Sequence, residues 1–166
     1  MSKFRVQVSR ERVTLPNGRV AQLDIVHHPG AAAVVPFVSA DDVLLIRQFR
    51  HAAGGTILEV PAGKIDPGDT PKSCAARELE EEAGRRAGRI EKLGWIFTTP
   101  GFTDEVIRLY VASELSVGES NLDADEFVEV LTFRFSEVLE MVRCGEIVDC
   151  KSVATILYAA QFVIGA

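Results

Sequence analysis

The sequence predicts an α+β fold, an αβα sandwich built on a mixed sheet. Strand patterns dominate the N-terminal part, a single helical pattern interrupts the middle, and further helices close the chain. The chain has 166 residues, of which 47% are hydrophobic and 25% are charged, as in one ordinary globular domain. This composition excludes a disordered chain, a collagen-like chain and a coiled coil.

The N-terminal segment reads as a β-hairpin followed by three strands. Asn17-Gly18 lies between two runs of β-forming residues, a strong signal that predicts a hairpin over residues 11–27. We expect residues 1–32 to form a strand and hairpin arm, part of the same unit as the main domain over residues 33–166. Three further strands are expected at 33–38, 43–49 and 57–60.

The pattern then changes from that of a strand to that of a helix. From Pro71 to Ala83 apolar residues recur at three- and four-residue spacing, which predicts a helix with one apolar stripe. Thr70 can cap this helix and Gly84 can end it. Later strands are expected at 90–98, 105–112 and 127–134, then a helix capped by Ser136 and ending near Cys144, and a helix from Asp149 to about Val163.

Charge and cysteine content narrow the class of function. The 18 basic and 24 acidic residues give a formal net charge of -6, which disfavours a nonspecific nucleic-acid binder. The longest apolar run, 31–38, is too short to span a membrane, and the charged N-terminus predicts no secretory signal. The three cysteines form no CxxC pair, so we expect thiols of a reducing cytoplasm, with no zinc or redox role.

Three carboxylates gather on one face of the expected middle helix. Glu78, Glu81 and Glu82 are three or four residues apart, and Arg77 can offset part of their repulsion. Clustered carboxylates form a hard oxygen site suited to Mg²⁺ or Mn²⁺. Two interpretations stay open on the residues alone, divalent-metal phosphate chemistry and a solvated acidic helix face.

The stretch from Gly63 to Arg85 resembles the signature of the Nudix hydrolases. Two positions depart from that signature: Asp69 keeps the charge of the usual Glu, and Arg85 replaces an aliphatic residue, which concerns local packing more than chemistry. The positions that match at fixed spacing are Gly63, Arg77, Glu78, Leu79, Glu81, Glu82 and Gly84.

Other segments resemble the ADP-ribose and nucleotide-sugar pyrophosphatase branch of that family. Pro100 lies 16 residues after Gly84, and the segments 46–52, 57–69 and 98–105 are similar to that branch. The resemblance implies an αβα sandwich, a homodimer formed through the hairpin arm, and hydrolysis of ADP-ribose to AMP and ribose 5-phosphate. It also implies Mg²⁺ as the metal ion, with Mn²⁺ as a substitute.

The resemblance also assigns roles to individual residues. The metal ligands would be Glu78, Glu82 and the Ala62 carbonyl, and Glu81 and Arg77 would complete the catalytic set. A general base would come from the loop before a late strand, with Glu126 preferred over Glu129. Substrate would be bound by Arg47 or Arg50, which we expect on opposite faces of a strand, and by Phe102 and Glu105; Trp95 is expected in the core rather than under a base.

Two alternatives remain beside ADP-ribose hydrolysis. The first is a pyrophosphatase acting on another nucleotide sugar, such as GDP-mannose. The second is a nucleotide-sensing module that binds without cleaving, although such a module is expected to have lost the signature glutamates. In each case the expected partner is a small nucleoside diphosphate in the cytoplasm, with neither nucleic acid nor membrane involved.

Overall fold

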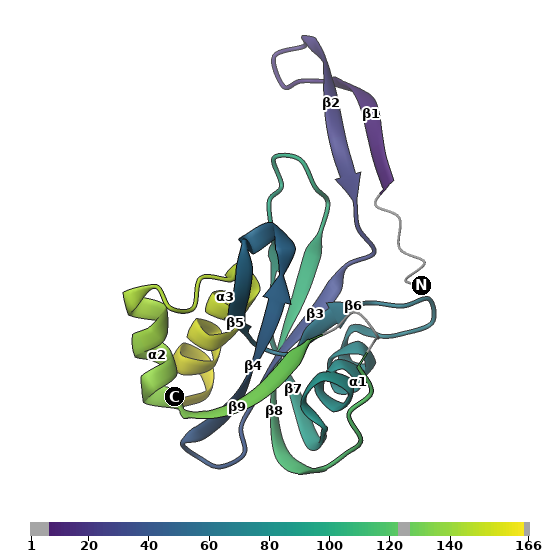
Figure 1. Ribbon diagram of the computed structural model, residues 1–166. Coiled ribbons are helices and arrows are strands. Elements are labelled where there is room, and N and C mark those ends of the chain that lie inside the picture. Colours follow the sequence, from purple (N-terminus) through teal and green to yellow (C-terminus); the bar gives the residue numbers. More distant parts are fainter. Residues whose placement is uncertain (1–6, 123–126, 165–166) are drawn as a thin grey trace.

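The computed structural model describes residues 7–122 and 127–164 (Figure 1). Three α-helices flank the strands: α1 covers one side, and α2 and α3 cover the other. The strands are β1 (Gln7–Thr14), β2 (Val20–His27), β3 (Ala31–Pro36), β4 (Asp42–Arg50), β5 (Gly55–Glu59), β6 (Ala62–Lys64), β7 (Arg85–Phe97), β8 (Val106–Val117) and β9 (Val128–Arg134). The helices are η1 (His51–Ala53), α1 (Pro71–Ala83), α2 (Phe135–Cys144), α3 (Cys150–Ala159) and the short π-helical η2 (Ala160–Ile164).

The strands form two sheets in the body of the molecule and a separate hairpin. One sheet has the order β6-β3-β8-β7 and the other the order β5-β4-β9. The β3–β8 pair is parallel, whereas the other pairs in these sheets are antiparallel. The predicted mixed sheet and αβα sandwich are therefore confirmed.

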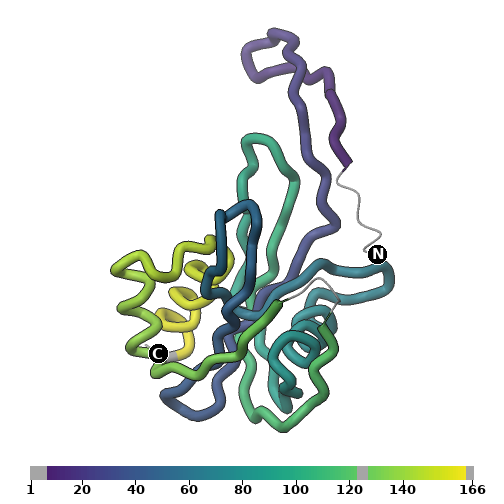
Figure 2. The backbone as a smooth tube through the Cα atoms, in the orientation of Figure 1, coloured from purple at the N-terminus to yellow at the C-terminus, as the bar shows by residue number. Residues whose placement is uncertain are grey.

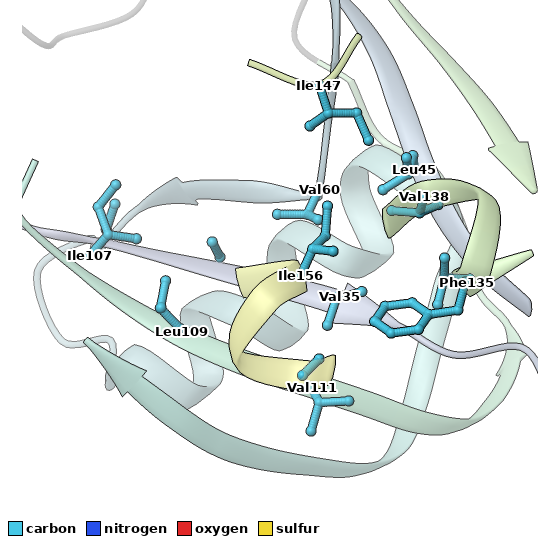
Figure 3. Packing of buried hydrophobic residues seen from close by; sticks show 14 residues of the cluster. Val35, Leu45, Val60, Ile107, Leu109, Val111, Phe135, Val138, Ile147 and Ile156 are labelled. Atoms are coloured by element: carbon cyan, nitrogen blue, oxygen red, sulfur yellow. The ribbon is translucent and has the colours of Figure 1, made fainter. Parts of the chain in front are cut away.

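Strand β3 lies at the centre of the sandwich and is buried on both faces. Ala33 and Val35 pack against the cluster that includes α2 and α3, whereas Ala32 and Val34 pack against α1. Figure 3 shows the first cluster, in which Ile156 of α3 lies among side chains from the strands. Alternate residues on a strand point to opposite faces, so an apolar run such as 31–36 serves two layers at once.

The N-terminal hairpin extends away from this body (Figure 2). β1 and β2 pair antiparallel along their whole length, from Gln7 opposite His27 to Thr14 opposite Val20. Gly18 takes a positive φ of 81° in the turn, which suits glycine and fits the Asn-Gly signal. The arm is fastened only at its base among the described residues, where Val26 donates to the carbonyl of Phe102 at 2.8 Å.

Helix α1 has the predicted bounds because its end signals are local. The Thr70 side chain accepts a hydrogen bond from the Ser73 amide, and Gly84 ends the helix in the left-handed conformation. The Asp149 cap of α3 is confirmed in the same way, through the Ser152 amide. Regular α-helix ends at Ala159, however, short of the expected Val163.

Two expectations were wrong. Ser136 does not cap α2 but lies inside it; the helix begins after Arg134, whose amide donates to Glu137 at 3.1 Å. Trp95 is not in the core, since it is 47% exposed. The neighbouring Ile96 takes the core position of this edge strand, so Trp95 lies on the other face, where the Arg108 guanidinium sits 5.6 Å from its ring centroid.

Candidate active site

The expected metal site lies where α1 packs on the short strand β6. Gly63 pairs with Ala32 of β3, and the Glu78 carboxylate occupies the space next to its Cα. A Cβ atom at Gly63 would overlap that carboxylate. Glycine is thus required here by a close approach of a side chain, not by its own backbone conformation.

Glu82 is held by the backbone one residue before Gly63. It is 3% exposed, and one carboxylate oxygen accepts a hydrogen bond from the Ala62 amide at 2.9 Å. Glu78, one helical turn away, is 13% exposed. The helix therefore presents two nearly buried carboxylates to the strand whose Ala62 carbonyl is the third expected ligand.

Arg77 is the charge partner of this acidic face. Its Nη1 donates to Glu78 at 2.7 Å and to Glu81 at 2.9 Å, and its Nη2 donates to the Lys64 carbonyl at 3.1 Å. Asp69, at the position where the signature has Glu, lies 3.3 Å from its Nε. Burial opposes the charge of Arg77, but Glu78 and Glu81 outweigh it and raise the pKa of the guanidinium above its ordinary value.

This donor set suits a hard divalent cation. The groups that converge on β6 are carboxylate and carbonyl oxygens, the ligands that Mg²⁺ and Mn²⁺ prefer. Within residues 7–122 and 127–164 no three His, Cys, Asp or Glu side chains form a ready-made metal cluster. The carboxylates of this face instead have protein partners, because Arg77 donates to Glu78 and Glu81 and the Ala62 amide donates to Glu82.

The two expected phosphate-binding arginines have different partners. Arg47 donates to Glu129 of β9 at 2.6 Å, and both side chains are largely exposed. Arg50 donates two hydrogen bonds to the carboxylate of Glu59 of β5, from Nε at 3.1 Å and from Nη2 at 2.7 Å. The two arginines thus turn to opposite neighbours of β4, and Arg50 alone of the two pairs with a buried carboxylate.

Phe102 and Glu105 lie in the loop between β7 and β8, at the base of the arm. Phe102 is 53% exposed, so its ring is accessible. Glu105 accepts from the Thr98 hydroxyl at 2.9 Å and lies 3.3 Å from Nδ1 of His28. This loop is joined to the arm, since the Asp104 amide donates to the Val26 carbonyl at 3.3 Å.

The preferred general base, Glu126, lies outside the described residues. The segment that leads to it is bound to the C-terminal end of α1: Ser120 Oγ and the Asn121 amide both donate to the Glu81 carbonyl, at 2.8 and 3.1 Å. The alternative base, Glu129, lies on β9 in its ion pair with Arg47. The roles of both glutamates stay predictions.

Sequence reasoning missed the residues that support Arg50. Glu59 is 2% exposed and also lies 3.3 Å from Nζ of Lys151, in the first turn of α3. A carboxylate inside the apolar run ILEV is one signal that was available. A lysine at a helix N-terminus opposes the helix dipole, which was a second signal of a tertiary partner.

His27, for which the sequence predicts no role, forms two side-chain contacts at the base of the arm. Its Nδ1 lies 2.7 Å from Asp104, and its Nε2 lies 2.7 Å from Ser9 Oγ. The hydrogen bond from His27 is the main cause that lowers the pKa of Asp104. His27 thus connects both strands of the arm to the loop that carries Phe102 and Glu105.

A family comparison bears directly on this site. The model of the NUDIX domain matches residues 26–147, well over half of the chain. The chain belongs to the NUDIX family. The family resemblance of the Gly63–Arg85 stretch is thereby confirmed, and proteins of the NUDIX family generally need a divalent metal ion.

Named relatives of this NUDIX protein are similar over most of its length. An ADP-ribose pyrophosphatase of Bacillus subtilis (strain 168) is 42% identical over 150 residues, which cover 89% of this chain and 81% of the relative. A methanol dehydrogenase activator of Bacillus methanolicus is 39% identical over 155 residues, 92% and 84% of the two chains. A GDP-mannose pyrophosphatase of Escherichia coli O1:K1 / APEC is 35% identical over 138 residues, 78% and 72%.

A solved structure described as an ADP compounds hydrolase has the same fold. The TM-score is 0.87, and the match covers 99% of this chain and 90% of the other. At 21% sequence identity this similarity concerns the fold alone. It agrees with the αβα arrangement of the described residues.

Proposed function

We propose that this NUDIX protein hydrolyses the diphosphate of ADP-ribose to AMP and ribose 5-phosphate, with Mg²⁺ as its metal ion. The observation that carries the proposal is the packing of Glu78 and Glu82 against Ala62 and Gly63. It is supported by the 42% identity to an ADP-ribose pyrophosphatase. Mn²⁺, which accepts the same oxygen ligands, is the expected substitute.

An acidic protein needs a cation to bind a diphosphate. The net charge of this chain is -6, and its site has carboxylates where the phosphates are expected. Glu78, Glu82 and the Ala62 carbonyl would hold the ion, with Glu81 and Arg77 beside them. A bound divalent ion offsets the charge of the phosphate oxygens, stabilises the transition state and lowers the pKa of bound water.

The protein's own side chains supply substrate binding and proton transfer in this proposal. Arg50 binds a phosphate, with Arg47 as the alternative, and Phe102 and Glu105 contact the distal sugar. Glu126 acts as general base and takes the proton of the attacking water. It is preferred over Glu129 because the carboxylate of Glu129 is engaged by Arg47 at 2.6 Å.

The metal assignment is tested with Glu82→Gln, which keeps the size of the side chain and removes its charge. Because the amide keeps an oxygen that can accept from Ala62, we expect the fold to remain while turnover falls on the order of 100-fold. The matched control is Glu91→Gln, on an exposed glutamate of β7 paired with Arg89. Near wild-type turnover of Glu82→Gln in an ADP-ribose assay would remove the assignment.

The second candidate substrate is another nucleotide sugar. It is favoured by the GDP-mannose pyrophosphatase that is 35% identical to this chain. The same metal site and base would serve, since the bond that is cleaved lies in the same diphosphate group. A binding module without hydrolysis is less well supported, because Glu78, Glu81 and Glu82 are all retained.

A homodimer and a cytoplasmic location complete the proposal. The two-stranded arm extends from the body, and an isolated pair of strands is marginally stable without a partner. Val8, Val20 and Leu23 of the arm are exposed and would be covered by a second subunit. Cys74, Cys144 and Cys150 are free thiols, in keeping with a reducing compartment. Within the described part of the chain no helix is long and apolar enough to cross a membrane.

A further inference from the structure

Lys151 lies in an unusual place for a lysine. It is only 13% exposed and belongs to the first turn of α3, where a positive charge opposes the helix dipole. Two carboxylates compensate for this, because Nζ lies 2.9 Å from Asp149 and 3.3 Å from Glu59. The position also lies beyond residues 26–147, which the NUDIX model matches.

Glu59 connects Lys151 to the arginine that the proposed function places on a phosphate. Its carboxylate accepts hydrogen bonds from Nε and Nη2 of Arg50, the latter at 2.7 Å. One of its oxygens also forms an ion pair with Lys151. A carboxylate that is 2% exposed is costly to bury unless it is paired, and here two cations pair with it. One edge of the Arg50 guanidinium is therefore bound to a buried carboxylate that has a second cation as partner.

The other side of that guanidinium remains available. An arginine has five N–H donors, and Glu59 uses Nε and one donor of Nη2. In the described part of the chain Nη1 of Arg50 has no acceptor, and the side chain is 39% exposed. The free edge, Nη1 and Nη2, is the one that can bind two oxygens of a phosphate.

The charge of Arg50 is also influenced by a carboxylate of α1, the helix with the expected metal ligands. Burial opposes its charge, but the carboxylates of Glu59, Glu82 and Asp149 together raise the pKa of its guanidinium. Glu82 is the buried glutamate bonded to Ala62. The charge of Glu82, an expected metal ligand, is thus one of the charges that act on Arg50.

The first turn of α3 holds the same segment by a second contact. The Val60 amide donates to the hydroxyl of Ser152 at 2.9 Å, and Ser152 is fully buried. Asp149 in turn accepts from both the amide and the hydroxyl of Ser152. Residues 59–60, directly before Pro61 and Ala62, are thus fixed by α3 through both a charge and a hydrogen bond.

We propose that Lys151 is a positioning residue for substrate binding: through Glu59 it orients the guanidinium of Arg50 so that the free edge receives a phosphate of the nucleotide. The inference rests on the proposed function for the role of Arg50. Lys151 also removes one unit of net negative charge from a cluster that would otherwise consist of Arg50, Glu59 and Asp149. Both effects favour an anionic ligand.

The test is the binding of AMP and of adenosine, measured by isothermal titration calorimetry with Mg²⁺ present. Lys151→Met keeps the length and the apolar stem but removes the charge. We expect it to weaken AMP binding about tenfold and to leave adenosine binding unchanged, because only AMP carries the phosphate. Lys151→Arg should restore most of the AMP affinity. The matched control, Lys92→Met, changes an exposed lysine of β7 and should bind AMP like the wild type.

A loss of stability is separated from a loss of positioning by a second variant. Glu59→Gln combined with Lys151→Met removes both buried charges, so its melting temperature should exceed that of Lys151→Met alone. The AMP affinity of the double variant should stay low, because the charged pair that orients the Arg50 guanidinium is absent. If AMP affinity instead follows the melting temperature across the variants, the role of Lys151 is structural and the inference is overturned.

The remaining outcomes are equally decisive. Wild-type AMP affinity in Lys151→Met, an equal loss for adenosine, or a wild type that does not bind AMP would each overturn the inference. ADP-ribose hydrolysis is measured on the same wild-type preparation. Suppose that the wild type binds AMP and that Lys151→Met weakens this binding as predicted, but that the wild type leaves ADP-ribose intact. The proposed function would then be refuted while the inference stands.

Discussion

Single residues shape this site by their size as well as by their charge. Gly63 provides the space that the Glu78 carboxylate fills, and Ala62 supplies the amide that binds Glu82. Arg77 offsets the repulsion between the adjacent carboxylates by pairing with both Glu78 and Glu81. The signature therefore combines a steric requirement at its first position with an electrostatic one in the helix.

The steric requirement is tested by Gly63→Ala. The added methyl group overlaps the Glu78 carboxylate, so Glu78 must leave its place. We expect turnover to fall on the order of 100-fold, since a misplaced catalytic group costs that much even when the fold persists. Steady-state kinetics measures the loss, and circular dichroism checks the fold.

Gly55→Ala is the matched control for that change. Gly55 lies at the start of β5, has no positive φ, and an added Cβ meets no atom within 4 Å. Its turnover should equal that of the wild type. Equal turnover in Gly55→Ala and Gly63→Ala would show that the close approach of Glu78 is dispensable.

At the scale of elements, the packing of α1 on β6 places the glutamates. Cys74 contributes to it from the buried side of the helix, where its Sγ lies 3.4 and 3.2 Å from the carbonyl oxygens of Gly63 and Lys64, either of which can accept the S–H. Burial, and next the charge of Glu78, raise the pKa of this thiol to about 12. The thiol accordingly stays protonated while it holds the helix to the strand.

This packing predicts a pH dependence of stability. An unfolded thiol ionises near its ordinary pKa of 9.0 and the folded one near 12, so the folded state binds the proton more tightly. The contribution is fully present below pH 9 and is lost as the pH rises toward about 12, by about 1.4 kcal/mol per pH unit. Urea unfolding of the wild type and of Cys74→Ala measures it. Equal pH slopes for the two proteins above pH 9 would contradict it.

Helices and strands that have turn or cap signals in their own sequence could be predicted. Elements that form only through pairing with distant segments could not. The hairpin and α1 follow from an Asn-Gly turn, a cap and a terminal glycine. Strand β6 has only three residues, and it exists because Ala62–Lys64 pair with Ala31–Ala33, far away in the chain. The cap of α2 was misassigned because Glu137, not the neighbouring serine, satisfies the first amide.

In the whole molecule, side chains from segments far apart in the sequence contact the expected site residues and the loop at the base of the arm. Glu59 contacts both Arg50 and Lys151 of α3, and Asp104 binds His27 across a separation of 77 residues. Neither residue periodicity nor residue spacing predicts such long-range contacts. The sequence therefore predicts Glu78, Glu82 and Arg50 as site residues, but not the side chains that contact them.

The arm is the other feature of the whole molecule with a consequence for function. Asp104 joins its base to the loop of Phe102 and Glu105, because its carboxylate is hydrogen-bonded to His27 and to the His28 amide. In the proposed homodimer the arm of one subunit would reach the other. Light scattering that finds only an 18.1 kDa species would contradict the dimer.

Cleavage of the diphosphate of ADP-ribose is the reaction that we propose for this NUDIX protein. It is tested most directly by incubating the purified protein and Mg²⁺ with ADP-ribose, ADP-mannose, GDP-mannose, NADH and an oxidised dGTP, with Glu82→Gln as the blank. We expect AMP and ribose 5-phosphate from ADP-ribose, in amounts well above the products from the other compounds and absent from the blank. Turnover of GDP-mannose alone would identify a different substrate, and a folded, metal-loaded protein that cleaves none of the five compounds would refute the proposed reaction.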